Sequence, residues 1–193
     1  MRQLTGESVR YYVCEPAICR RREWMSVSGP NIIGMTFLRE LEAESPATRK
    51  CLERVPPSLF DWKPHERSMP MGYLSHIVAE IPLWVKHMVM SPEIDFVKFE
   101  HYHAASTADL VAFFERNMGE AREALTSTSD EHLEGPLNLM AGGKLVMTLP
   151  RNVNVSQTIN HLVHHRGQLT VYLRLNDIPV PAIYGPSADE RGY

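Results

Sequence analysis

Apolar residues recur with helical spacing in four stretches of this sequence, at about residues 31–55, 69–90, 107–127 and 153–176. Charged residues fill the positions between them, which is typical of helices that bury one face. Each apolar stripe has to be covered by another element, and helices that follow one another along a chain cover each other best as a bundle. The sequence therefore predicts an all-α protein, a four-helix bundle.

Proline, serine and aspartate mark several ends of these predicted helices. Pro46 lies inside the first stretch, so either that helix bends or a second helix begins there. Ser68 is a candidate N-cap for the second helix, with Pro70 in its first turn. Ser106 and Asp109 have the spacing of a capping box at the start of the third helix.

The segments between the helices differ in length and composition. Residues 91–105 form a connector long enough to cross the length of a bundle. Gly142-Gly143 lies between two short apolar runs and predicts a β-hairpin before the last helix, because both positions of such a turn require positive φ. Residues 1–30 show no sustained periodicity and are predicted to be a peripheral or poorly ordered arm, which leaves residues 31–193 as the helical domain.

Composition excludes several classes of function. The chain of 193 residues has a formal net charge of −3, so it offers no basic excess for nucleic-acid binding. No apolar run approaches the roughly 20 residues that a membrane span needs, and no signal-peptide core is evident, so a cytoplasmic protein is expected. The three cysteines form no CxxC pair, which argues against a disulfide framework or a structural zinc knuckle.

The segment Asn160–Gln168 (NHLVHHRGQ) contains the chemically richest cluster of the chain. His161 and His165 are four residues apart and project from one face of a helix, where two imidazoles can bind one divalent metal. Gln168 and Tyr172 fall within about 60° of them on the same face. The alternative is that the two histidines lie on a solvated or interface surface.

His76 offers a third imidazole, from the second predicted helix. Three imidazoles and one open position form a common catalytic zinc site, whereas a lone histidine on an apolar helix is more often a hydrogen-bonded core residue. Glu80, one turn later, is either a ligand or base of this site or an exposed helix glutamate. His101 and His103, on the connector, either overhang the site or are solvated.

These residues resemble the DinB/YfiT-like superfamily of bacterial metalloproteins over roughly residues 33–186. The resemblance rests on Trp62-Lys63-Pro64, on Leu74-x-His76, on the NHLVHHRGQ segment and on the ending from Leu173 to Pro181. It implies a bundle with an up-down-down-up course and frequent homodimers. It also implies a zinc or nickel ion held by three histidines, at the matching positions His76, His161 and His165.

The resemblance further implies reactions of low-molecular-weight thiols such as bacillithiol, mycothiol or glutathione, catalysed by thiol S-transferases or maleylpyruvate isomerases. The leading hypothesis is a metal-dependent enzyme, a thiol S-transferase or hydrolase acting on a small-molecule substrate. In it, Gln168, Tyr172 or Glu80 would orient the nucleophile or move a proton. The rival hypothesis is a non-enzymatic dimeric binding or stress-response module with a structural metal, and a third is a metal-free bundle.

Overall fold

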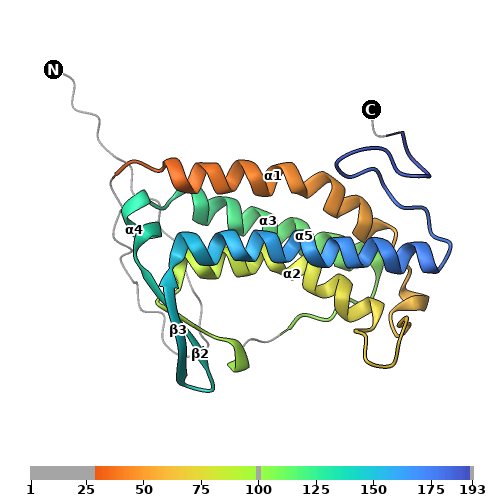
Figure 1. The fold of residues 1–193 in the computed structure, drawn as a ribbon, viewed down its shortest axis with the longest axis horizontal. Coiled ribbons are helices and arrows are strands. Elements are labelled where there is room, and N and C mark those ends of the chain that lie inside the picture. Colours follow the sequence, from red (N-terminus) through yellow and green to blue (C-terminus); the bar gives the residue numbers. More distant parts are fainter. Residues whose placement is uncertain (1–28, 99–100, 192–193) are drawn as a thin grey trace.

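Four long helices form the body of the protein (Figure 1). The computed structural model describes residues 29–98 and 101–191. Its long helices are α1 (Ile32–Glu53), α2 (Met71–Met90), α3 (Thr107–Thr126) and α5 (Arg151–Leu175). Helix α2 packs against α3 and α5, and α1 packs against the same two helices from the other side. The shared core is apolar and includes the fully buried side chains of Leu41, Leu52, Leu74, Leu110, Phe114 and Ile159.

Two helix starts show how the chain satisfies the free N–H groups of a first turn. At α3, the Ser106 hydroxyl accepts a hydrogen bond from the N–H of Asp109, as the capping box predicted. At α2, the predicted cap by Ser68 is wrong. The helix begins at Met71, whose N–H donates to the carbonyl of Trp62, and the next N–H, of Gly72, donates to the carbonyl of Phe60. Backbone carbonyls of the preceding loop therefore replace a side-chain cap.

A small sheet stands at one end of the helices (Figure 1). Strand β2 (Pro136–Ala141) lies in the middle, antiparallel to β3 (Lys144–Pro150) and parallel to β1 (Glu93–Asp95). The predicted hairpin is confirmed, with φ of +58° at Gly142 and +79° at Gly143. The Asp95 carboxylate accepts hydrogen bonds from both glycine N–H groups, at 2.9 and 2.8 Å, and so ties β1 to the hairpin turn.

The predicted all-α four-helix bundle is wrong as a description of this fold. The described residues form five α-helices, including the short α4 (Asp130–Glu134), and a three-stranded mixed sheet. Strand β1 and the 3₁₀ turn Phe96–Lys98 lie within the connector, residues 91–105, for which the sequence predicted no helix or strand. Three residues are too few to show an alternating pattern, and β1 is stabilised by pairing with a strand far along the chain.

Three further predictions concern Pro46 in the first helix, the N-terminal arm and membrane-spanning segments. Helix α1 continues through Pro46 as one helix, so no second helix begins there. The predicted arm, residues 1–30, falls almost wholly outside the described residues. No helix within residues 29–98 or 101–191 combines the length and the apolar character that crossing a bilayer requires.

Helices α1 and α3 approach closely at Gly34. A Cβ atom at this position would lie 2.6 Å from the carbonyl oxygen of Leu125, on backbone that cannot easily move. We expect Gly34→Ala to lower the free energy of unfolding by about 1–3 kcal/mol through overpacking. Gly119→Ala, in α3 with nothing within 4 Å of the added Cβ, is the control and should raise it by about 0.5–1 kcal/mol. Urea denaturation measures both, and equal signs for the two variants would contradict the prediction.

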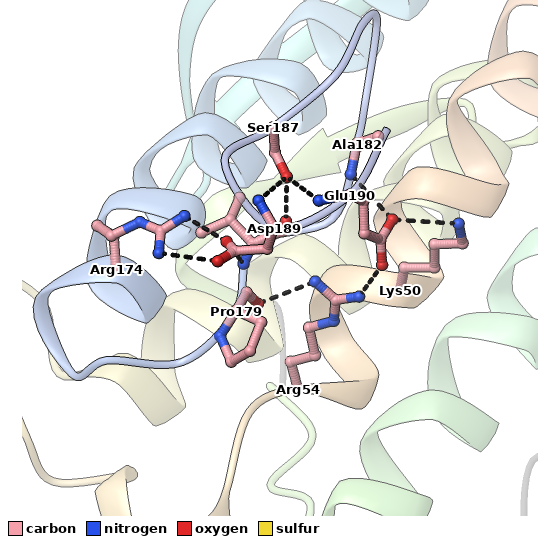
Figure 2. A network of polar contacts seen from close by, with 9 residues as sticks. Lys50, Arg54, Arg174, Pro179, Ala182, Ser187, Asp189 and Glu190 are labelled. Carbon is pink, nitrogen blue, oxygen red and sulfur yellow. Dashed lines mark hydrogen bonds and ion pairs between the residues drawn. The ribbon is translucent and has the colours of Figure 1, made fainter. Parts of the chain in front are cut away.

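The C-terminal segment, residues 177–191, folds back over the ends of α1 and α5 (Figures 1 and 2). Asp189 pairs with Arg174 and accepts a hydrogen bond from the N–H of Val180. Glu190 pairs with Arg54 and accepts one from the N–H of Ala182. Two carboxylates therefore hold the segment to itself and to both helices.

Acid is expected to release this C-terminal segment. The ion pair with Arg174 holds the pKa of Asp189 below its usual value, and the N–H of Ala182 together with Arg54 does the same for Glu190. Carboxyl groups with a lowered folded-state pKa stabilise above their unfolded pKa of about 4, and lose that contribution as pH falls through the folded value. The protection of the Val180 and Ala182 amides, measured as exchange relative to that of an unprotected amide at the same pH, should therefore fall below about pH 4.

The matched variants for this test are Asp189→Asn and Glu115→Gln. Asp189→Asn should show fast exchange at Val180 already at neutral pH, since the charge on the acceptor is lost. Glu115 pairs with Arg49 at the surface of α3 and α1, and neither residue forms an ion pair with the described C-terminal segment, so the Glu115→Gln variant should behave like the wild type. Protection of the Val180 amide that stays the same at neutral and at acid pH would contradict the prediction.

Candidate metal centre

Two histidines of α5 point at each other. The Nε2 atoms of His161 and His165 are 2.6 Å apart, and the ring centroids are 4.4 Å apart. His165 is buried, with 8% of its surface exposed. Its Nδ1 lies 2.7 Å from Oε1 of Gln168, one turn further along the helix. An amide oxygen only accepts, so this contact places the proton of His165 on Nδ1 and the lone pair on Nε2.

Both imidazoles favour the neutral form. Loss of hydration lowers the pKa of His161, and charges on His165 and His164 would lower it further. Burial also lowers the pKa of His165, against the opposing effect of the Gln168 hydrogen bond. The two neutral rings share a hydrogen bond, in which Nε2–H of His161 donates to the lone pair of His165 Nε2 at 2.6 Å. This pair therefore fits as part of a metal site, because neutral imidazole nitrogen is the form that binds a metal.

His76 lies on α2 with 8% of its surface exposed. Its Nδ1 contacts the carbonyl of Gly72, and its Nε2 accepts a hydrogen bond from the N–H of Ala104. The ring of His103 lies edge-on to it, 5.9 Å between centroids. The proton is again on Nδ1, held by a carbonyl as in many metal-binding histidines, but Nε2 already has a partner.

The structure thus brings two of the three predicted ligands together. Among residues 29–98 and 101–191, no three His, Cys, Asp or Glu side chains are gathered in a way that could hold a metal ion. For His76 to join the pair on α5, its Nε2 would have to exchange the N–H of Ala104 for the metal. The three-histidine set remains a prediction, and the tautomers of His76 and His165 are compatible with it.

Glu80 and Trp84 continue the face of α2 that carries His76, at successive steps of four residues. The Trp84 ring packs on His161, 5.5 Å between centroids, so this face meets α5 at the histidine pair. Glu80 is buried rather than exposed, and its carboxylate lies 2.7 Å from Nδ1 of His101 on the connector. The reading of Glu80 as an exposed helix glutamate is therefore excluded.

Tyr172 was predicted to share one face of α5 with His161, His165 and Gln168, but its contacts lie elsewhere. Its hydroxyl donates to the carbonyl of Met69 at 3.2 Å, and its ring packs edge-on against Trp62. These contacts hold α5 against the loop before α2. Of Gln168 and Tyr172, only Gln168 hydrogen-bonds a histidine of the pair.

Sequence reasoning left the position of His101 and His103 open. The connector brings them to Glu80 and His76 respectively, a placement that depends on its path across the helices. One signal in the sequence could have predicted part of this placement. Glu80 lies in an otherwise apolar helix, and a buried carboxylate needs a hydrogen-bonding or positively charged partner.

Comparisons with known proteins agree with this fold. A protein of Bacillus subtilis (strain 168), the uncharacterized protein YrdA, is 27% identical over 162 residues, covering 80% of this chain and 89% of that protein. A solved DinB-like protein of Bacillus subtilis, YjoA, superposes with a TM-score of 0.61 at 17% identity, over 77% of this chain and 96% of its own. A DinB-like protein of Bacillus cereus ATCC 10987 gives 0.59 at 23% identity, over 78% and 97%.

These structural similarities show the arrangement of helices alone, since both identities lie below 25%. The sequence profile of the DinB family matches residues 25–191, which includes α2, α5 and every residue of the site described above. The chain therefore belongs to the DinB family.

Proposed function

We propose that this protein is a metal-dependent enzyme, a thiol S-transferase or a hydrolase acting on a small molecule, with His76, His161 and His165 as ligands of one zinc or nickel ion. The observation that carries the proposal is the meeting of the His161 and His165 Nε2 atoms at 2.6 Å, with the His165 tautomer set by Gln168. A divalent cation bound there would act as a Lewis acid that stabilises a thiolate or a hydroxide near neutral pH.

The surrounding residues have defined tasks in this proposal. Gln168 holds the His165 ring and keeps its Nε2 unprotonated. Gly72 does the same for His76 through its carbonyl. Trp84 packs against one side of the His161 ring. Tyr172 keeps α5 and the loop before α2 in place, which makes it a positioning residue rather than a proton carrier.

Elemental analysis of the purified protein tests the metal site. We expect about one zinc or nickel ion per chain in the wild type, and loss of most of it in His161→Ala and in His76→Ala. Far-UV circular dichroism should show an unchanged helix content in both variants, because alanine is the strongest helix former and neither histidine belongs to the apolar core. Full metal retention by His161→Ala would refute the proposed site.

The alternative is a non-enzymatic homodimeric binding module in which any metal is structural. It is supported by the edge strand β3, where Leu145 and Val146 are 59% and 57% exposed and could pack against a second copy. A metal that exchanges slowly, and whose removal unfolds the protein, would favour this alternative. A folded metal-free protein that takes the metal up again would favour the enzyme.

A further inference from the structure

The predicted metal-binding nitrogen of His76 is occupied by the backbone of the connector. Its Nε2 accepts a hydrogen bond from the N–H of Ala104, and the two residues are buried, at 8% and 7% exposed. A buried N–H group needs an acceptor, and here the imidazole lone pair is that acceptor. A metal would bind His76 through the same electron pair, because neutral imidazole has one nitrogen with a free lone pair. The Ala104 N–H and a metal ion therefore cannot be bound to His76 at the same time.

The two partners of this hydrogen bond are held with different firmness. The His76 ring is tied to its own helix by the contact of Nδ1 with the carbonyl of Gly72, and the Phe60 ring lies edge-on to it, 5.8 Å between centroids. Ala104 lies outside helix and strand, between two exposed residues. Residues 102–105 make no backbone–backbone hydrogen bond to any described residue. When the bond to Nε2 breaks, the connector is therefore the side expected to move.

We propose that the Ala104 N–H and the metal compete for His76 Nε2, so that metal uptake at the candidate centre releases the connector from α2 at Ala104. The inference rests on the proposed function and adds to it a regulation of the same site. Exchange of the N–H for the metal moves no proton, because the His76 proton stays on Nδ1. The released N–H has to be hydrated or to find another acceptor, and this cost lowers the affinity for the metal.

The coupling between metal and connector acts in both directions. By thermodynamic linkage, a change that loosens the connector at Ala104 strengthens metal binding, and bound metal loosens the connector by the same factor. The connector also carries His103, whose ring lies edge-on to that of His76, 5.9 Å between centroids. The position of the connector beside the predicted ligand thus depends on whether the metal is bound.

Hydrogen exchange at the Ala104 amide tests the competition in the wild-type chain. The protein is freed of metal with a chelator, and amide protection is measured residue by residue by NMR, with and without zinc. Zinc should lower the protection of Ala104 by about 2- to 10-fold, the range that corresponds to one net hydrogen bond. The Asp109 amide, which donates to the Ser106 hydroxyl at the start of α3, should keep its protection. Because a ligand that binds the folded protein normally raises protection, a fall confined to Ala104 is specific for the competition.

Removing the N–H tests the same competition through the affinity for zinc. Ala104→Pro takes away the donor and should bind zinc about 2- to 10-fold more tightly than the wild type. Ala105→Pro introduces the same ring one residue later, where the N–H makes no backbone–backbone hydrogen bond to a described residue, and should bind zinc like the wild type. Competition with a chromogenic chelator measures the affinities, and circular dichroism checks that each variant keeps its helices.

The outcomes separate this inference from the proposed function. Zinc that binds the wild type and is lost in His161→Ala, but leaves the Ala104 amide as protected as before, would overturn the competition and leave the proposed function standing. Equal zinc affinities of Ala104→Pro and Ala105→Pro would have the same meaning. Should Ala104→Pro fail to fold, the amide measurement on the wild type decides alone. If neither the wild type nor Ala104→Pro binds zinc, the proposed function fails and the competition with it.

Discussion

Replacing Arg166 with alanine is expected to lower the free energy of unfolding by about 3–5 kcal/mol, because the change leaves a partly buried carboxylate without its counter-ion. Arg166 is 1% exposed and extends from α5 to α1, where it pairs with Glu44 and donates to the Thr48 hydroxyl at 3.1 Å. It also donates to the Tyr184 hydroxyl at 2.8 Å and lies over that ring. One guanidinium therefore joins α5, α1 and the C-terminal segment.

Urea denaturation followed by circular dichroism measures this loss, and two further variants identify its cause. Arg122→Ala removes an arginine that also pairs with a glutamate of α1, Glu42, but at the exposed surface, so we expect a loss below about 1 kcal/mol. Adding Glu44→Gln to Arg166→Ala should restore part of the stability, since the uncompensated charge is removed. Equal losses for Arg166→Ala and Arg122→Ala would contradict this account.

The sequence pattern was sufficient to predict those elements that are determined by residues close to one another in the chain. The third helix and its cap follow from Ser106 and Asp109, and the hairpin follows from two glycines that can take positive φ. The His161 and His165 pair follows from a spacing of four on one helix. In each case the residues that determine the structure lie within a few positions of one another.

Features that depend on distant partners could not be predicted in this way. Strand β1 has three residues and exists through its pairing with β2. The first N–H groups of α2 are satisfied by carbonyls of the preceding loop, which no side chain in the sequence reveals. The partner of Glu80, His101, lies on the connector, and the N–H that occupies His76 comes from Ala104 of the same segment. Long-range topology sets each of these contacts.

Zinc is expected to raise the stability of the wild type strongly and that of His165→Ala hardly at all. A ligand that binds only the folded protein adds about 4 kcal/mol when its free concentration is a thousand times its dissociation constant. For a chain of this size, each kcal/mol corresponds to about 2–4 °C in the melting temperature, so a shift of about 8–16 °C follows. Nickel should act in the same direction, because imidazole suits both metals.

The control for this measurement is His164→Ala, on the same helix. The His164 ring touches that of His165, 5.1 Å between centroids, but its side chain is not a predicted ligand, so most of the zinc shift should remain. Thermal scans with and without a chelator compare the three proteins. A shift in His165→Ala equal to that of the wild type would show that zinc binds elsewhere. A metal-free wild type that still melts cooperatively would show that the fold forms without the metal, which argues against a structural metal because a structural metal is needed for folding.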